Sequence, residues 1–525
     1  MPLGADERFS ISGNRPPGSV RLPRRHPFQL RVRALASTLL LQTTRDRSTS
    51  GRRLIIGLFI LLAGLFVSAC RPDQPADGRV RIVYWEKWTG TEGAAVQEVV
   101  DRFNSLQDRI YVEYLAVSQV DRKTIVATAG GDPPDVAGIW AAQVATFADN
   151  NALTPLEDFI EADGTSVDEF LSRYMPVYAD MCLFDGRVFA LPSTPATIAL
   201  HWNKTLFREA GLDPERPPRT LAELDEYARR LTKRDPDTGE ITQIGFLPQE
   251  PGWWPWAFFG WFGGSLFDEE GEVSIGSDPH NLTAMEWVRS YTEEYGLDDI
   301  TRFTSGFGGF ASPQFGFFSR RVAMVFQGVW FDNYMSQFSP GLDYGAAPWP
   351  EAGGGTTEGP FAIADADILI IPRGTSHPKE AWEFVKYLNS VNPKAETKAE
   401  LGGMELLCLL QAKNSPMHDW SPYFLRAHPH PYIGVFRELA SSPGVVHLPM
   451  VGIWQEYDRE ITTMFDRIRL LDTTPNAGLA YTHTRITGTW NRHRKSMQRQ
   501  RSAAAKAARK LPGTDRSKPN PSQIE

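Results

Sequence analysis

The chain has 525 residues, of which 42% are hydrophobic and 22% charged, and its formal net charge is −8. This composition excludes an intrinsically disordered chain, a collagen-like repeat and a polytopic membrane protein, and the length suggests about two to four folding units. Residues 1–69 and 491–525 each carry a net charge of +8, which leaves −24 on the residues between them. Because so acidic a body repels phosphate groups, we expect no nucleic-acid partner.

An export signal is predicted near the N-terminus. Residues 54–67 form a long apolar run, with Arg52 and Arg53 before it and Ser-Ala-Cys70 after it. A helix of this length rises about 21 Å, less than the ~30 Å hydrocarbon core, so the run is typical of a signal peptide. Cys70 follows Val-Ser-Ala, which resembles the bacterial lipobox, and we expect a diacylated cysteine at the mature N-terminus. The alternative is a signal anchor with an incidental cysteine.

The segments around this signal lack the pattern of a folded domain. Residues 1–53 are basic, and we expect them to combine a translation start placed too early with the basic region of the signal. Residues 54–69 then hold the apolar region and the lipobox, and residues 70–79 form a polar linker. At the other end, residues 491–525 form a basic tail that we expect to be partly disordered.

The exported body opens with the pattern of an α/β domain. Alternating residues at 81–85 and 110–115 predict two strands, and apolar residues at helical spacing over 96–106 predict a helix between them. This β-α-β order favours parallel strands. Further predicted elements are a helix after the capping-box pattern Thr220-Leu-Ala-Glu223, buried strands at 322–326 and 368–371, and a helix from Pro378 with Trp382 on its apolar stripe.

The residue types that carry catalysis or bind metals show no recognised spacing. The sequence has no G-x-S-x-G, no G-x-x-x-x-G-K-[ST] and no H-E-x-x-H, and its histidines lack the spacing of metal ligands. We therefore expect no enzyme, no metal site and no cofactor, although glycosidase carboxylates pair in space and escape a motif search. Cys182 and Cys408 are either a disulfide of an oxidising compartment or two buried thiols, and the sequence leaves both open.

Tryptophan is the residue type in excess, with 15 in the chain. Several follow predicted strands or lie in turns, and ligands gather beyond the carboxyl ends of strands in open α/β sheets. A flat ring can stack there on the apolar face of a sugar, while carboxylates and amides bind the sugar hydroxyl groups. The alternative for any single ring is core packing. The candidates are Trp85, Trp88, Trp140, Trp253 and Trp254 beside Glu250, Trp330, Trp349 and Trp454.

Several segments together resemble the family 1 extracellular solute-binding proteins of ABC importers, whose relatives include the maltodextrin-binding protein. They follow one another in the family's order over about residues 80–470. The matching segments are 131–136, 151–158, 186–192, 200–213, 218–224, 318–324, 328–330, 345–350 and 370–388.

The resemblance implies a two-lobed α/β periplasmic-binding-protein fold, type II-like, with a multi-strand hinge and a ligand cleft between the lobes. Lobe one would comprise residues 80–194 and 366–410, and lobe two residues 195–365 and 411–490. Residues that match the family's ligand-binding positions would be Trp85, Trp88, Thr89, Ser193, Glu250, Trp253, Trp330 and Trp454.

The function that the resemblance implies is that of a substrate-binding lipoprotein of an ABC importer. We expect it to capture an oligosaccharide or glycoside by lobe closure and to deliver it to a membrane permease. It would be a monomer on the outer face of the cytoplasmic membrane, or periplasmic, held by Cys70. The alternatives are an exported glycan hydrolase that uses Glu250, and a ligand sensor of the same fold.

Overall fold

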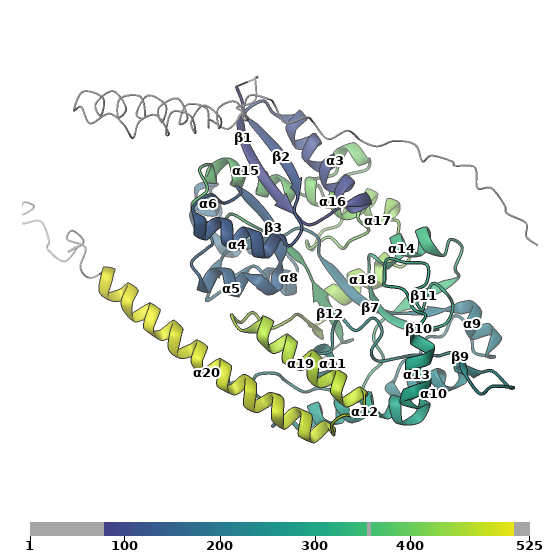
Figure 1. Cartoon of the computed structure of the whole chain (residues 1–525). Helices are drawn as coiled ribbons and strands as arrows, with labels where there is room; N and C mark the ends of the chain where they lie inside the picture. Colours follow the sequence, from purple (N-terminus) through teal and green to yellow (C-terminus); the bar gives the residue numbers. More distant parts are fainter. Residues whose placement is uncertain (1–77, 354–358, 509–525) are drawn as a thin grey trace, which may run out of the picture. The chain divides into compact units, whose positions relative to one another are not determined.

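The computed structural model describes residues 78–353 and 359–508, which all belong to one compact unit (Figure 1). The expected signal segment and Cys70 lie outside the described residues. Among the helices of these residues, none is both long enough and apolar enough to cross a membrane.

Lobe one is built on a five-stranded sheet in the order β2-β1-β3-β13-β6. Strands β1 (Val80–Glu86), β2 (Ile110–Ala116) and β3 (Val136–Trp140) are parallel, and α3 (Gly90–Leu106) joins the first two. This confirms the predicted β-α-β opening. Strand β13 (Asp367–Ile370) returns from lobe two and pairs antiparallel with both β3 and β6 (Ala190–Pro192).

Helices and short strands surround this sheet. They are α4 (Val120–Gly130), α5 (Val144–Asp149), α6 (Glu157–Ala162), α7 (Val167–Leu171), α8 (Pro176–Asp180), the hairpin of β4 (Leu183–Phe184) and β5 (Arg187–Val188), α15 (Pro378–Leu388) and α16 (Gly403–Leu410). Pro378 begins α15 as expected, and Trp382 is buried, with its indole N–H donating to Asp163 at 2.8 Å.

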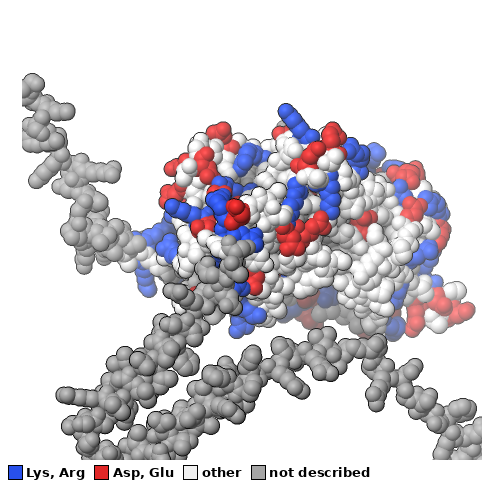
Figure 2. All heavy atoms as spheres, turned by 90° about the horizontal axis from the view of Figure 1, so that it is seen from above, with Lys and Arg blue, Asp and Glu red and all other residues white. Residues whose placement is uncertain are grey.

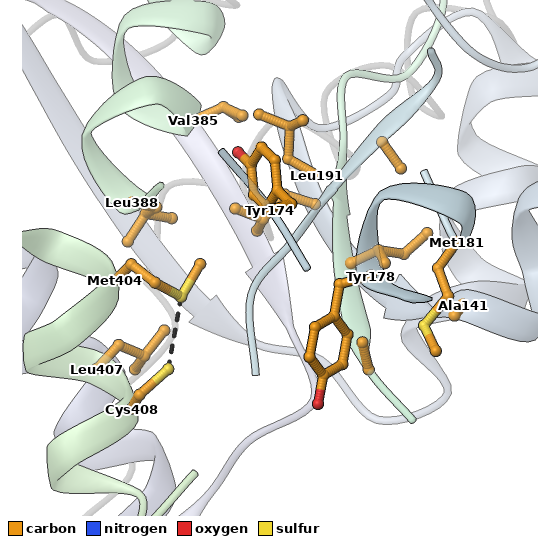
Figure 3. Packing of buried hydrophobic residues seen from close by; sticks show 14 of the residues in the cluster. Ala141, Tyr174, Tyr178, Met181, Leu191, Val385, Leu388, Met404, Leu407 and Cys408 are labelled. Carbon is orange, nitrogen blue, oxygen red and sulfur yellow. Dashed lines mark hydrogen bonds between the residues drawn. The ribbon is translucent and has the colours of Figure 1, made fainter. Parts of the chain in front are cut away.

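The two cysteines of the described residues, Cys182 and Cys408, are buried free thiols, and Figure 3 shows Cys408 in the core of lobe one. Cys408 donates to the sulfur of Met404 at 3.5 Å, and Cys182 donates to the carbonyl of Tyr178 at 3.2 Å. Burial raises the pKa of both thiols above the usual range. Of the two readings left open by the sequence, the structure therefore selects two buried small apolar residues.

Lobe two is built on a second sheet in the order β10-β7-β12-β14, with β11 also paired to β7. Its long central strand β7 (Ala196–Asn203) is buried along its whole length. The other strands are β10 (Met324–Gly328), β11 (Tyr344–Ala347), β12 (Ala362–Asp365) and β14 (Val445–Val446), and a small hairpin is formed by β8 (Lys233–Arg234) and β9 (Ile241–Gln243). Aromatic side chains fill the core, and Phe326 stacks on Trp349 with 3.6 Å between ring centroids.

The helices of lobe two lie around this aromatic core. They are α9 (Lys204–Glu209), α10 (Leu221–Leu231), α11 (Ala257–Trp261), α12 (Pro279–Tyr295), α13 (Leu297–Thr304), α14 (Phe331–Phe338) and α19 (Trp454–Arg469). The capping box predicted before α10 is half present. Thr220 accepts from the N–H of Glu223, but Glu223 accepts from the N–H of Arg219 instead of that of Thr220.

Three neighbouring segments connect the two sheets, and the third is the segment after α16 that contains Asn414. The chain crosses from β6 to β7 through residues 193–195 and returns from β12 to β13 through Ala366. The N–H of Ser193 donates to the carbonyl of Asp367 at 2.8 Å, and the N–H of Asn414 donates to that of Pro195 at 3.1 Å. These backbone bonds hold the crossings side by side, which gives the hinge more than one strand.

The segment after residue 410, where we expected lobe one to end, contacts both lobes. The segment 411–440 contains α17 (Pro422–Ala427) and α18 (Ile433–Ala440), and its apolar side chains join the core cluster of lobe one. On the other side, α18 lies against β7 of lobe two. The segment therefore packs between the two sheets, and α18 buries one apolar stripe formed by Ile433, Phe436, Leu439 and Ala440.

The last helix, α20, extends from Pro475 to Ala508, as the yellow helix in Figure 1 shows. It continues well into the residues that we expected to be partly disordered. Its first half packs on α12 and α19, with Leu479 and Ile486 buried.

Candidate functional site

A cavity of about 440 Å³ lies where the two lobes meet the crossing segments. Its walls combine aromatic rings with charged side chains. The lining residues are Trp88, Glu92, Trp140, Thr194, Ala196, Trp253, Trp254, Phe310, Trp330, Tyr334, Asp365, Ala366, Asp367 and Lys413.

Lobe one contributes two rings from the carboxyl ends of neighbouring parallel strands. Trp88 follows β1, and Trp140 is the last residue of β3 with 43% of its surface exposed. The ammonium group of Lys87 lies 4.6 Å from the ring centroid of Trp88 and 4.0 Å from that of Trp140. A cation over an aromatic face is attractive, so Lys87 helps to hold both rings in place.

Lobe two contributes a second group of rings on loops that its sheet positions. Trp253 is 43% exposed and packs edge-on against Trp254 and Phe310. Trp254 lies 6.3 Å from Trp330, centroid to centroid. The Trp330 ring packs against Gly328, where a Cβ would lie 2.4 Å from the ring carbons, so only glycine permits this ring position.

The floor of the cavity is formed by acidic residues of the crossing β12–β13. Asp367 is buried, forms an ion pair with Lys87 at 2.6 Å and accepts from the hydroxyl of Thr194. Asp365 accepts from the N–H of Ala366 at 2.9 Å. Burial, with the nearby Asp367 charge adding to it, raises the pKa of Asp365 to about 6.

Lys413 provides a buried ammonium group in the same cavity. Only 5% of this residue is exposed, and its ammonium group lies 4.3 Å from the Trp330 centroid and 5.2 Å from that of Trp88. It therefore contacts rings of both lobes. Burial lowers the pKa of Lys413, and Glu92 and Asp367 oppose that shift.

Glu92 connects lobe one to lobe two at the cavity wall. Tyr334 of α14 lines the same cavity, and burial together with the Glu92 charge raises the pKa of its hydroxyl to about 12. Burial raises the pKa of Glu92, and the charge of Lys413 acts in the opposite direction. Because the partners come from α3, α14 and the segment after α16, this polar group forms only in the folded arrangement of both lobes.

Five of the ten predicted binding residues line this cavity, namely Trp88, Trp140, Trp253, Trp254 and Trp330. The other five do not line it. Trp85 packs against the core of lobe one, Thr89 occupies the N-cap of α3 without a side-chain cap bond, and Ser193 is buried at the crossing. Trp454 is 3% exposed and packs on Trp256 and Tyr457, because it starts a helix whose apolar stripe faces the core of lobe two.

Glu250 lies behind the rings and not among them. It lines a small neighbouring pocket that shares Trp253 and Trp254 with the main cavity. Burial raises the pKa of Glu250 to about 7, and the charge of Arg469 opposes this shift.

The residues that sequence reasoning missed are those that contribute charge to the cavity: Glu92, Asp365, Asp367 and Lys413. Asp365 and Asp367 interrupt the apolar stretch 361–371, which is a signal that the sequence contained. Glu92 and Lys413 have no such signal. Among the residues that the structure describes, no three His, Cys, Asp or Glu side chains come together as a metal site would require.

Comparison with known proteins adds independent information. A family model described as bacterial extracellular solute-binding protein matches residues 87–392, more than half of the chain. The maltotriose-binding protein of Pyrococcus abyssi is 22% identical over 404 residues, which cover 73% of this chain and 82% of that protein. The sn-glycerol-3-phosphate-binding periplasmic protein of Escherichia coli K12 is 29% identical over 157 residues, 29% of this chain and 35% of that protein.

Solved structures resemble this fold over most of its length. The structure of CpMnBP1 with bound mannotriose superimposes with a TM-score of 0.66 and 27% identity, covering 77% of this chain and 99% of that one. A substrate-binding protein of Listeria monocytogenes in complex with cycloalternan gives a TM-score of 0.61 at 20% identity, covering 79% and 99%. At 20% identity, the similarity to the Listeria protein shows a common fold and nothing more.

Proposed function

The chain belongs to the family of bacterial extracellular solute-binding proteins, and on that premise we propose that it is the carbohydrate-binding subunit of an ABC importer. It captures an oligosaccharide or glycoside between its lobes and delivers it to a membrane permease. The observation that carries this proposal is the gathering of Trp88, Trp140, Trp253, Trp254 and Trp330 around one cavity.

The size and walls of the cavity support a sugar of more than one ring. A volume of about 440 Å³ lies in the range of small-ligand sites, which is about 300–1,000 Å³. Aromatic faces on both sides offer stacking surfaces for the apolar faces of successive sugar rings. Carboxylates and the Lys413 ammonium group can bind the hydroxyl groups at the edges.

The charges of the cavity favour an uncharged carbohydrate. Glu92, Asp365 and Asp367 line it, against Lys413 as the lining cation. Lys87 beneath the rings is already paired with Asp367 and lies 3.5 Å from Glu86. A phosphorylated polyol would meet more carboxylates than ammonium groups, so a phosphate group is disfavoured. Mannotriose and maltotriose are therefore better first probes than sn-glycerol 3-phosphate.

The crossing segments suggest how binding is signalled. A ligand that contacts rings of both lobes binds better when the lobes are close, and this difference in affinity shifts the population toward the closed state. The permease then distinguishes closed from open protein. The energy for transport would come from a separate ATPase, since this sequence has no phosphate-binding G-x-x-x-x-G-K-[ST] loop.

Export and anchoring complete the proposal. The apolar run 54–67 and the lipobox-like Val-Ser-Ala-Cys70 support a diacylated Cys70 that holds a monomer on the outer face of the cytoplasmic membrane. Metabolic labelling with a radioactive fatty acid tests this part. We expect label in the natural chain and none in C70A.

The protein is proposed to bind its ligand without cleaving it. A carboxyl with a pKa near 7, as at Glu250, is a feature of a general acid, so this point needs its own control. Glu250, however, lines a separate pocket of only about 10 Å³. Purified protein incubated with mannotriose or maltotriose should release no shorter sugar, and turnover that E250Q abolishes would favour a hydrolase.

The test of the main proposal is intrinsic tryptophan fluorescence of the protein from Arg71 onward, titrated with mannotriose, maltotriose and sn-glycerol 3-phosphate. We expect a saturable change with a trisaccharide and none with the phosphate. The change should be weakened in W330A and retained in W382F, whose altered ring packs on Phe159 in the core of lobe one. No response to either sugar in folded protein would argue for another ligand class.

A further inference from the structure

The C-terminal helix α20 is fixed to lobe two along its first half. It has 34 residues and so measures about 50 Å. Leu479 and Ile486 are buried in the core of lobe two, and Arg485 pairs with Glu460 of α19 at 2.6 Å. Trp490 donates from its indole N–H to the carbonyl of Gly271 at 2.9 Å. Up to this residue the helix is part of lobe two.

Beyond Trp490 the same helix reaches lobe one. Nε2 of His493 lies 3.2 Å from Oδ2 of Asp149, the last residue of α5, and the His493 ring stacks on Trp490. Two turns further, Arg501 pairs at 2.5 Å with Asp185, which lies in the turn between β4 and β5. One rigid helix is thus anchored in lobe two and contacts two separate elements of lobe one.

The Asp149 contact is built by a close approach of three segments. Only 8% of the Asp149 side chain is exposed. Gly452, in the loop before α19, lies directly over it, and a Cβ there would be 1.9 Å from Oδ2 of Asp149 and 2.7 Å from Cε1 of His493. A side chain at position 452 would therefore displace the Asp149 carboxylate and the His493 ring from their contact.

Polar contacts rather than a packed core hold this end of the helix. A cavity of about 760 Å³ lies between α20 and lobe one, lined among others by Phe184, Met450 and Met497. Burial raises the pKa of Asp149, the neighbouring His493 and Arg501 side chains oppose the shift, and Asp185 adds to it. The lobe-one end of α20 can therefore detach at a smaller energetic cost than its lobe-two end.

We propose that α20 is an interlobe strap, whose contacts His493–Asp149 and Arg501–Asp185 restrain the motion of lobe one relative to lobe two. This goes beyond ligand capture but presupposes the lobe motion of the proposed function. Contacts that exist in one lobe arrangement and break in another contribute their full free energy to the equilibrium between the two. The strap would therefore set how far the ligand-free protein samples other arrangements.

The test measures the distance between the lobes without any ligand. Spin labels are introduced as genetically encoded residues at Leu106 of lobe one and Thr238 of lobe two, both exposed, in the full chain in detergent. Double electron–electron resonance then compares the natural chain with H493A/R501A. We expect a broader or shifted distance distribution in the variant, and an unchanged distribution would overturn the proposal.

A matched control separates the strap from a general effect of lost charge. R501A and R485A each remove one guanidinium that pairs with a carboxylate at 2.5 or 2.6 Å, but the Glu460 partner of Arg485 lies in lobe two. R501A should broaden the distribution and R485A should not; equal effects would overturn the strap. Circular dichroism verifies that each variant is folded. If the double variant H493A/R501A unfolds, R501A alone still tests the proposal, because it removes only an exposed ion pair.

A second variant reaches the same contact without removing a charge. G452A should separate Asp149 from His493 and change the distribution in the same sense as H493A/R501A, and a distribution identical to that of the natural chain would contradict the proposal. Because the distance measurements need no sugar, they can fail or succeed independently of the fluorescence titration that tests carbohydrate binding. Where mannotriose binds, its affinity should change about two- to fivefold in H493A/R501A, the effect of one or two partly exposed pairs.

Discussion

Replacing Trp330 by alanine tests whether the ring cluster of the cavity binds sugar. The Trp330 ring lies 6.3 Å from the Trp254 ring, centroid to centroid, and 4.3 Å from the Lys413 ammonium group, so these neighbours hold it in a defined position at the junction of the lobes. A sugar stacked on one face covers roughly 60 Å² of apolar surface, about a third of what a large aromatic side chain buries. At about 25 cal/mol per Å² this contributes about 1.5 kcal/mol.

The expected result for W330A is therefore a roughly tenfold weaker Kd for the trisaccharide that binds the natural protein. Isothermal titration calorimetry measures this without relying on tryptophan emission. G328A provides a milder version, because the Cβ would displace the Trp330 ring without removing it, and its Kd should lie between those of the natural protein and W330A. A folded W330A whose Kd differs by less than about twofold would refute the stacking argument.

Three further predictions concern the described residues. Because the pKa of Asp365 is raised to about 6, the folded state keeps a proton that the unfolded state loses, so this group makes stability fall as pH rises from about 4 to 6. In D365N that part of the fall in Tm should be absent; an identical pH profile would contradict it. G245A should lower the free energy of unfolding by about 1–3 kcal/mol, because its Cβ would lie 2.3 Å from the carbonyl oxygen of Ala228; urea unfolding measures this, and no loss would show that the backbone adjusts. In the protein from Arg71 onward, Cys182 and Cys408 should resist a thiol reagent until denaturant is added and then both react; rapid labelling of the folded protein would show that the thiols are accessible.

The part of the fold that depends on local pattern was predictable. The β-α-β opening and the helix from Pro378 follow from alternation, helical spacing and a proline at the first turn, which act within a few residues. The rings of Trp88 and Trp140 were also predictable as a pair. Trp88 follows β1 and Trp140 ends β3, and the carboxyl ends of such neighbouring parallel strands meet at one edge of the sheet.

The charged half of the candidate site could not be predicted. Lys413 and Glu92 are more than 300 positions apart in the sequence, and they meet only because the segment after α16 returns to α3 between the lobes. Trp454 is the opposite case, a residue that the sequence pattern predicted in the binding site and that does not line the cavity. Its sequence context resembles that of a binding ring, yet the apolar stripe of α19 buries it in the core of lobe two.

What the sequence alone determined is the order of strands and helices, the family and the aromatic character of the cavity, because these depend on neighbouring residues and on matched segments. The tertiary structure decided which rings share a cavity, that both cysteines stay free, and that the basic C-terminal residues continue a helix onto lobe one. Each of these results from contacts between distant residues. Such contacts form only when burial of the two cores offsets the loss of chain entropy, and no local pattern records them.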